Sequence, residues 1–169
     1  GLDIPTSGKC LINNECISEL DDQKRAKFRL SHIGIVFQSF NFLMSLTIEE
    51  NISVPAILKN SPTNLKNDIR QITKILGIEK LLNRYPNEVS GGELQRACIA
   101  RALINNPEII LADEPTGNLD KENRKIVLDS IKTIIKEFEV TVLMVTHDIE
   151  IESSADRIFH IDDGTLKQI

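Results

Sequence analysis

Two short apolar runs, with one long amphipathic segment between them, constrain the fold of this chain more than any other feature. Ile109–Ala112 is an unbroken apolar run, and Val140–Val145 is apolar except for Thr141. Residues 121–138 repeat apolar side chains at helical spacing, and the inward face is expected to consist of Val127, Ile131, Ile134, Ile135 and Phe138. A strand, a helix and a second buried strand in this order form a right-handed crossover. The sequence therefore predicts an α/β fold with a mostly parallel sheet.

Two more strands are expected outside this unit. Ile33–Phe37 is apolar and rich in β-branched residues, and it stops at Gln38, so we predict a strand that is buried on both faces. Ile158–Ile161 predicts the last strand of the sheet, followed by a turn at residues 162–164.

The first thirty residues predict a hairpin followed by a helix. Lys9–Ile17 contains two short apolar segments around Asn13 and Asn14, a pair that is typical of a tight turn. Ser18, with an acidic residue three positions later, is expected to cap a polar helix that runs to about Leu30.

Residues 38–105 are rich in helix signals. Thr47 and Glu50 form a capping box for a short helix that Pro55 is expected to limit or kink. Residues 62–77 carry one apolar helical stripe that ends at a glycine, and its members are Leu65, Ile69, Ile72 and Leu76. We therefore expect this part of the chain to be helical.

Length and composition exclude several classes of protein. The chain has 169 residues, 41% of them apolar and 27% charged, which suits one compact domain or a domain with a small lobe. Its net charge of −5 argues against bulk electrostatic binding of nucleic acid. No apolar run approaches the roughly 18 residues needed to cross a membrane. Cys10, Cys16 and Cys98 form no C-x-x-C pair, so we expect a reducing cytosol rather than a disulfide framework or a zinc site.

Polar residues follow three predicted strands at the point where each strand ends. They are Gln38, the pair Asp113-Glu114, and His147. Because ligands bind at the carboxyl ends of parallel strands, this shared position indicates a site. One carboxylate can hold Mg²⁺, and the other can orient or deprotonate a water beside a phosphate. Taken alone, the acidic pair also fits a solvated turn, and a single histidine in such a place is more often structural.

Ser90 opens another predicted helix, which runs to about Ile104. Gly91 and Gly92 allow backbone N–H groups to approach an anion closely, and the helix N-terminus adds positive potential. Ser90 can both cap the helix and donate to a phosphate oxygen. For this motif alone, a capped helix after a loose turn is the alternative.

In chain order these motifs form one series, which is Gln38, Val89–Arg96, Ile109–Asp120 and His147. The series resembles the nucleotide-binding subunit of ABC (ATP-binding cassette) transporters over essentially the whole chain. Within that family, residues 37–43 and Asn118 most resemble the bacterial group of lipoprotein-release, macrolide-export and antimicrobial-peptide ATPases. The resemblance implies a P-loop NTPase (RecA-like) fold. Residues 1–37 and 106–169 would form its sheet part, and residues 38–105 an inserted helical subdomain.

The resemblance assigns catalytic and cofactor roles to four positions. Gln38 is similar to the Q-loop glutamine, which contacts Mg²⁺ and the attacking water and senses the permease. Asp113 matches the Walker B aspartate near Mg²⁺, and Glu114 matches the catalytic glutamate. His147 matches the switch histidine that contacts the γ-phosphate. The implied cofactors are ATP and Mg²⁺.

Further positions resemble the family's subunit interface. Ser90, Gly91 and Gly92 match the signature motif, which closes over the γ-phosphate bound to the opposite subunit. Glu93 stands where many members have Gln, and this subfamily often uses Glu. Asp120 matches the D-loop aspartate. The implied partners are a second ATPase subunit, as a homodimer or a pair, and an integral membrane permease, with no nucleic acid.

The chain departs from the family pattern at the phosphate-binding loop, because it has no G-x-x-x-x-G-K-[ST] motif. Residues 7–9 imitate the end of that motif, but Asp3 occupies the first glycine position and Cys10 the Ser/Thr position. Sulfur is a poor ligand for Mg²⁺. We therefore expect the P-loop, its helix, two strands and the adenine-stacking aromatic to lie N-terminal to Gly1. We also expect this chain alone to show no appreciable ATP hydrolysis.

The segment after Gln38 is expected to face the permease. Phe40, Phe42, Leu43 and Met44 place four large apolar residues within five positions. We predict that residues 40–58 dock a cytoplasmic helix of the permease. The alternative is that these side chains fill the seam between the helical part and the sheet.

The leading hypothesis is therefore an ATPase that energises a permease from the cytoplasmic face of the cell membrane. The subfamily resemblance favours export, or extraction of lipid or peptide. One alternative is a soluble ABC ATPase of DNA repair or translation, although the span between Gln38 and Ser90 leaves no room for the usual coiled-coil insertion. Another is a truncated, non-hydrolysing half-cassette, against which intact Glu114 and His147 weigh.

Overall fold

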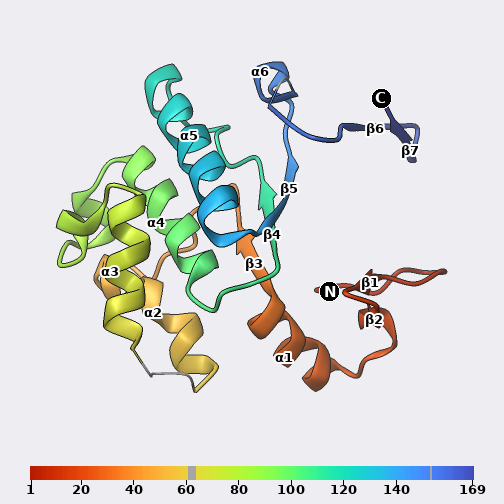
Figure 1. Cartoon of the computed structure of the whole chain (residues 1–169), viewed down its shortest axis with the longest axis horizontal. Helices are drawn as coiled ribbons and strands as arrows, with labels where there is room; N and C mark the ends of the chain where they lie inside the picture. Colours follow the sequence, from red (N-terminus) through yellow and green to blue (C-terminus); the bar gives the residue numbers. More distant parts are fainter. Residues whose placement is uncertain (61–63, 153) are drawn as a thin grey trace.

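The computed structural model describes residues 1–60, 64–152 and 154–169, and a three-stranded parallel sheet lies at its centre. The strands β3 (Ile33–Val36), β4 (Ile109–Asp113) and β5 (Thr141–Val145) lie side by side in this order (Figure 1). Each strand is a short, mostly apolar segment, as the sequence predicts. The prediction that β5 is buried was wrong, because only Val142 and Met144 pack against the core, whereas Leu143 and Val145 are 55% and 59% exposed. The expected α/β architecture with a parallel sheet is confirmed.

The crossover from β4 to β5 is made by α5 (Lys121–Phe138), which has the predicted bounds. Three of its own residues, Val127, Ile131 and Ile134, are buried, whereas Ile135 is 40% exposed. The prediction that Ile135 points inward was wrong, because the neighbouring Ile134 already occupies the buried face at that turn of the helix.

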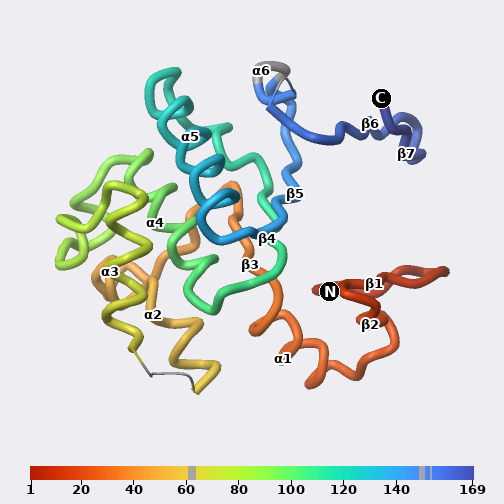
Figure 2. The backbone as a smooth tube through the Cα atoms, in the orientation of Figure 1, coloured from red at the N-terminus to blue at the C-terminus, as the bar shows by residue number. Residues whose placement is uncertain are grey.

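Three helices fill the chain between β3 and β4, as Figure 2 traces: α2 (Ile48–Leu58), α3 (Leu65–Ile75) and α4 (Gly91–Leu103). Short 3₁₀ turns at Glu79–Leu81 and Pro86–Glu88 join α3 to α4. The central helix is α4, since it packs against α2, α3, α5 and β3. The helical part therefore shares one core with the sheet.

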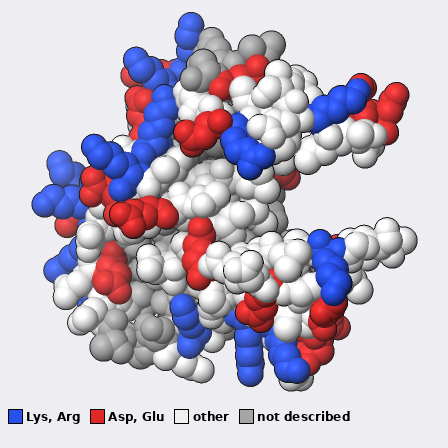
Figure 3. Space-filling model, turned by 45° about the vertical axis from the view of Figure 1, so that its right-hand side comes forward, with Lys and Arg blue, Asp and Glu red and all other residues white. Residues whose placement is uncertain are grey.

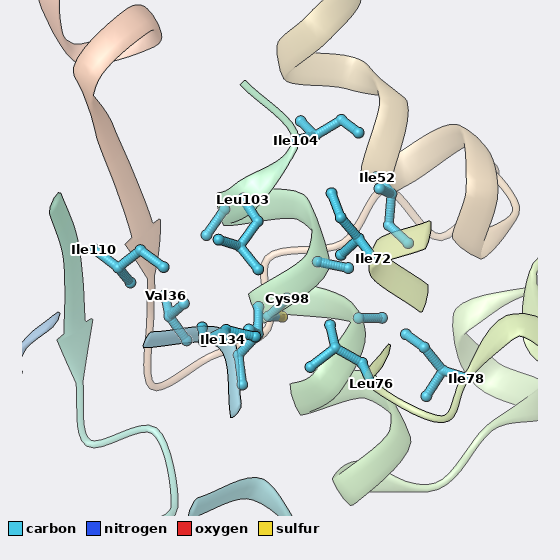
Figure 4. Packing of buried hydrophobic residues seen from close by; sticks show 14 of the residues in the cluster. Val36, Ile52, Ile72, Leu76, Ile78, Cys98, Leu103, Ile104, Ile110 and Ile134 are labelled. Atoms are coloured by element: carbon cyan, nitrogen blue, oxygen red, sulfur yellow. The ribbon is translucent and has the colours of Figure 1, made fainter. Parts of the chain in front are cut away.

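That core is a continuous cluster of buried aliphatic side chains. Figure 4 shows Val36 and Ile110 from the sheet, Cys98 from α4 and Ile134 from α5 within it. The approach of α4 to β3 depends on Gly34, where a Cβ would lie 2.6 Å from the backbone oxygen of Ala102. A side chain at this position would push the helix away from the sheet.

The capping box of Thr47 and Glu50 begins α2 as predicted, with both reciprocal hydrogen bonds present. Of the two outcomes expected at Pro55, a limit or a kink, the helix does not end there, since α2 continues past it to Leu58. Ile52 and Ala56 on either side of the proline are buried, so their packing holds the helix together despite one missing backbone N–H. The expected start of α3 at residue 62 lies outside the described residues, and Gly77 follows the helix with a positive φ, as predicted.

The N-terminal hairpin forms as predicted from β1 (Leu11–Ile12) and β2 (Glu15–Cys16). Ser18 does not cap the next helix, because it lies within a 3₁₀ turn (Ile17–Glu19), where its hydroxyl accepts a bond from the Cys10 amide. The cap of α1 (Asp22–His32) is Asp21, whose carboxylate accepts from the Lys24 amide at 2.8 Å. Ser18 and Asp21 are both suitable capping residues. Asp21 is the cap because it directly precedes the helix with an extended backbone, whereas Ser18 lies inside the 3₁₀ turn.

The last predicted strand forms but does not join the parallel sheet. After β5 and the short α6 (Ile149–Glu152), β6 (Phe159–Asp162) pairs antiparallel with β7 (Thr165–Gln168). Figure 1 shows this hairpin projecting away from the sheet, and both of its strands are exposed. The turn at residues 162–164 permits local pairing, and this satisfies β6 without a neighbour from the sheet.

None of the described helices is long and apolar enough to cross a bilayer. Figure 3 shows acidic and basic side chains interspersed over the visible face, with uncharged surface between the two projecting hairpins. No single sign of charge dominates this face.

Candidate functional site

Gln38, Glu114 and His147 follow three neighbouring strands at one edge of the sheet. The parallel register places Asp113, the last residue of β4, opposite Val145, the last residue of β5. The carboxyl ends of these strands are therefore level, and the polar residues that follow them share one edge. This is the arrangement expected from the sequence.

The tightest contact at this edge joins Glu114 to His147. The Nδ1 atom of His147 lies 2.6 Å from Oε1 of Glu114, and the two side chains are 80% and 18% exposed respectively. An ionised carboxylate only accepts hydrogen bonds, so Nδ1 carries the proton in this pair. The Nε2 atom then faces outward, and it donates to a ligand only when the imidazole ring is protonated.

The backbone of Glu114 has an unusual conformation, with φ at +44°. Its N–H donates to the carbonyl of Val145 at 2.9 Å, and its own carbonyl accepts from the Gly117 amide at 3.1 Å. A positive φ is uncommon for a residue with a side chain, although eight other non-glycine residues among the described ones also have it, including Asn64 and Glu139 at helix ends. These bonds hold the Glu114 carboxylate beside the end of β5.

The loop after Glu114 also contacts the segment after β3. The Nδ2 atom of Asn118 donates to the backbone oxygen of Gln38 at 3.4 Å, while the Gln38 side chain is exposed. Asp113 is exposed as well. The structure thus brings Gln38, the acidic pair and His147 together. In the sequence, Asn118 stands out only as a subfamily feature, and no sequence signal indicates its contact with Gln38.

Asp120 ends this loop and begins α5. Its carboxylate accepts bonds from the backbone and side-chain nitrogens of Asn123, at 2.9 Å and 2.7 Å. These two bonds hold the pKa of Asp120 below its ordinary value, the backbone bond having the larger effect. Asp120 therefore fixes the start of α5 as a negatively charged cap.

Ser90 and Glu93 form a reciprocal capping box at the start of α4. The Ser90 backbone N–H and hydroxyl both donate to Glu93 Oε2 at 2.8 Å, and the Glu93 amide donates back to Ser90 Oγ at 3.4 Å. The bonds from Ser90 lower the pKa of Glu93. The single hydroxyl proton of Ser90 is used within the box here, so Ser90 must release Glu93 before it donates to a ligand.

The two glycines after Ser90 lie against the loop that follows β4 and the first turn of α5. A Cβ on Gly91 would lie 3.7 Å from the Leu119 side chain and 3.8 Å from the Phe40 ring, whereas one on Gly92 would collide with the Asn123 side chain. Among the described residues, no hydrogen bond or ion pair links Ser90, Gly91 or Gly92 to Glu114 or His147. The predicted residues therefore fall into two groups, one at the sheet edge and one at the start of α4.

The donors at the sheet edge fit a magnesium ion that a nucleotide would help to hold. In the described parts of the chain, no cluster of three or more His, Cys, Asp or Glu side chains is arranged to bind a metal. The exposed oxygen donors are the Asp113 carboxylate and the Gln38 amide. Mg²⁺ is usually held by one or two protein ligands together with phosphates and waters, so two oxygen donors suffice.

The segment that imitates a P-loop end takes no part in this site. Lys9 pairs with Glu19 at 2.6 Å beside the N-terminal hairpin, and this partner raises the pKa of Lys9. Cys10 is exposed next to it.

Comparison with known proteins identifies the family of the chain. A family model described as "ABC transporter" matches residues 1–117. The chain belongs to the ABC transporter family. It is 43% identical to the ABC transporter ATP-binding protein YtrE of Bacillus subtilis over 164 residues, which make up 96% of this chain and 71% of that protein.

Two further ABC proteins show how the match extends. The chain is 36% identical to the lipoprotein-releasing system ATP-binding protein LolD of Colwellia psychrerythraea over 169 residues, covering 99% of this chain and 66% of that protein. The solved structure of the ATP-binding cassette MJ0796, dimeric and bound to ADP and Pi after hydrolysis, superposes with a TM-score of 0.85. It is 38% identical and covers 99% of this chain and 75% of that chain.

These ABC relatives confirm the P-loop NTPase class of fold that the sequence predicts. They are named as ATP-binding proteins of ABC transporters, so the chain is an ATP-binding part of such a system. The chain spans between 66% and 75% of the length of the three proteins compared.

Proposed function

We propose that the protein hydrolyses ATP at the sheet edge formed by β3, β4 and β5 and thereby drives a membrane permease. The observation that carries this proposal is the 2.6 Å contact between Glu114 and His147. It pairs a half-buried carboxylate, suited to accept a proton from water, with an exposed imidazole, suited to contact a phosphate. Both residues lie beyond the ends of their strands, so their contact is not part of the sheet pairing.

In the proposed reaction, water attacks the γ-phosphorus of ATP and the bond to the β–γ bridging oxygen breaks, which gives ADP and phosphate. Glu114 orients the water and accepts its proton. With its ring protonated on both nitrogens, His147 donates from Nε2 to a γ-phosphate oxygen, and the bond from Nδ1 to Glu114 fixes the direction of the ring. Asp113 and Gln38 would hold Mg²⁺, which neutralises charge on the phosphates when it is bound.

The second group of residues supports action as a dimer. Ser90, Gly91 and Gly92 begin α4, where backbone N–H groups and the helix dipole favour an anion. Because these residues have no described bond to Glu114 or His147, we propose that they bind the γ-phosphate held by a second subunit. The dimeric structure of the ATP-binding cassette MJ0796 supports this arrangement.

A Glu114→Gln variant tests the proposal. Glutamine keeps an oxygen that accepts from His147 Nδ1 but cannot take a proton from water. In the natural protein, this substitution should lower the rate of ATP hydrolysis by about 100-fold or more, while ATP binding persists. The variant should then elute as a dimer in gel filtration with ATP.

A Glu122→Gln variant, altered at an exposed carboxylate in the first turn of α5, serves as the control and should hydrolyse ATP normally. If the Glu114→Gln variant stays monomeric with ATP and hydrolyses it at the normal rate, both role assignments fail.

We further propose that the permease exports its substrate or extracts a lipid or peptide, and that the protein acts at the cytoplasmic face of the membrane. The similarity to LolD supports extraction. The docking surface proposed for the permease is residues 40–58. Leu43, Met44, Ile57 and Leu58 in this segment are between 55% and 65% exposed, whereas Phe40 and Phe42 pack against the core.

A further inference from the structure

Arg101 on α4 binds the chain just after the Gln38 segment. Its Nη2 donates to the backbone oxygen of Phe40, and its Nη1 donates to that of Asn41, each at 2.7 Å. Two successive carbonyls are therefore held by one guanidinium group. The planar fork of arginine can make both bonds at once, whereas a lysine amine is a single point.

Two further contacts hold the same segment. The guanidinium carbon of Arg101 lies 4.7 Å from the centroid of the Phe42 ring, within the range of a cation–π contact. The thiol of Cys98, one turn earlier on α4, donates to the Phe40 oxygen at 3.3 Å. Figure 4 shows Cys98 within the buried cluster, so this side of α4 is fixed by the core.

Arg101 has an unusual environment for a cation. It is half-buried, and burial lowers its pKa. Within the described residues, no carboxylate forms an ion pair with it; its two short bonds go to backbone oxygens, and a longer one of 4.0 Å goes from Nη2 to the Cys98 sulfur. A cation that loses hydration without gaining an anion is costly, so this position indicates a requirement for the geometry of the guanidinium fork rather than for charge balance.

The helix that holds the segment is also the one that begins with Gly91 and Gly92. At its other end, α4 meets the loop after β4 through Gly91, which lies beside Leu119, and the first turn of α5 through Gly92, which lies beside Asn123. The same loop bonds to the Gln38 carbonyl through Asn118. The segment after β3, the start of α4 and the loop after Glu114 therefore form one closed set of contacts.

We propose that Arg101 is a positioning residue that ties the segment after Gln38 to α4, so that a displacement of residues 40–44 moves the start of α4 with it. The inference rests on the proposed function, because it makes Arg101 the link by which a docked permease acts on both groups of site residues. Arg101 touches no reacting atom in this account.

Two variants and one control test the link. Arg101→Gln removes the fork and the charge, and Arg101→Lys keeps only the charge. Lys59→Gln is the matched control, because Lys59 also donates to a backbone oxygen in the helical part, that of Asn105 at 3.2 Å. Hydrogen–deuterium exchange should be about tenfold faster for the amides of residues 39–46 in both Arg101 variants and unchanged there in the control.

The functional arm compares ATP hydrolysis by the complete protein with and without its permease in vesicles. In both Arg101 variants, stimulation of kcat by the permease should fall by about tenfold, while KM for ATP stays within about twofold. A general loss of folding would instead lower the amount of active protein and raise exchange throughout α5.

The outcomes separate the hypotheses. Unchanged exchange at residues 39–46, exchange that rises equally in α5, or an Arg101→Lys variant that behaves like the wild type would each overturn the proposal. A wild-type protein that hydrolyses no ATP would overturn the proposed function, and the exchange measurement would still decide whether Arg101 holds the segment.

Discussion

Gly91 and Gly92 are adjacent at the start of α4, yet they differ greatly in the space around them. Gly92 is buried, and a Cβ there would lie 2.7 Å from Cγ of Asn123, whereas the nearest atom at Gly91 is 3.7 Å away. A Gly92→Ala variant should therefore lose about 1–3 kcal/mol of stability through overpacking. The free energy of unfolding in urea, measured for the wild type, for Gly92→Ala and for a Gly91→Ala variant, would show this loss.

Gly91→Ala is the control, because alanine fits the space and favours the helix. It should change the free energy of unfolding by less than about 1 kcal/mol. Equal losses in the two variants would show that the contact with Asn123 yields and that Gly92 is not required for packing.

The residues of the site were predictable to different degrees. Gln38, Glu114 and His147 could be predicted because each follows an apolar strand, and parallel strands align their ends. The 2.6 Å bond between Glu114 and His147 could not, because the positive φ of Glu114 directs its side chain and has no sequence signal. The bonds of Arg101 could not be predicted either, since a single cation on a mostly apolar helix face does not indicate which groups it will bind.

Among the elements, the helix starts are the most sensitive to acid. Bonds from Thr47 lower the pKa of Glu50, and bonds from Ser90 lower that of Glu93, below the ordinary value of 4.5. A carboxyl group with a lowered folded pKa stabilises the protein above its unfolded pKa, and this contribution is lost as pH falls through the folded value. The unfolding temperature should therefore decrease as pH drops below about 4.5.

The double variant Glu50→Gln, Glu93→Gln should make that decrease shallower, because glutamine keeps an acceptor oxygen but does not titrate. Glu137→Gln, at an exposed carboxylate near the end of α5, is the control and should leave the slope unchanged. The capping account would be wrong if the double variant showed the full acid dependence in differential scanning calorimetry.

The loop between β3 and α2 exposes two large apolar side chains. Leu43 and Met44 are 55% and 60% exposed, and Asn51 fixes the loop by accepting from the Leu43 amide at 2.8 Å and donating to its carbonyl at 3.0 Å. Replacing Leu43 and Met44 with Ser should weaken co-purification with the permease by about tenfold through lost apolar contact. ATP hydrolysis without the permease should stay within a few-fold.

Ile57→Ser and Leu58→Ser at the far end of the segment, also exposed, map how far the surface extends. Undiminished association in the Leu43 and Met44 variant would move the docking site elsewhere. Unfolding of that variant would assign these residues to the seam between the helices and the sheet.

Secondary structure was predictable where local rules acted without competition. The capping box of α2, the Ser90 cap of α4 and the bounds of α5 follow from spacing alone, whereas the part of Glu93 in the α4 cap was not predicted. The choice of Asp21 over Ser18 as a cap depends on a 3₁₀ turn between them, and the continuation of α2 through Pro55 depends on the packing of Ile52 and Ala56. Tertiary contacts decided both cases, and a single sequence does not reveal them.

For the whole molecule, the strongest expectation concerns residues 1–169 expressed alone. They have no G-x-x-x-x-G-K-[ST] motif, and Lys9 in the imitating segment pairs with Glu19. A P-loop supplies most backbone N–H bonds and the lysine that hold the phosphates. Isothermal titration with Mg-ATP should therefore detect no binding in the micromolar range, and a micromolar dissociation constant would contradict the expectation.

The parallel pairing of β3 with β4 has a consequence for synthesis on the ribosome. The two strands adjoin in space, with Gly34 opposite Ile110, but α2, α3 and α4 lie between them in the chain. At about 5–20 residues per second, β3 emerges several seconds before its partner. During that interval Ile33–Val36 is an unpaired apolar segment on the nascent chain, the kind of target that chaperones bind. The segment after Gln38 gains its two bonds from Arg101 only when α4 has been translated.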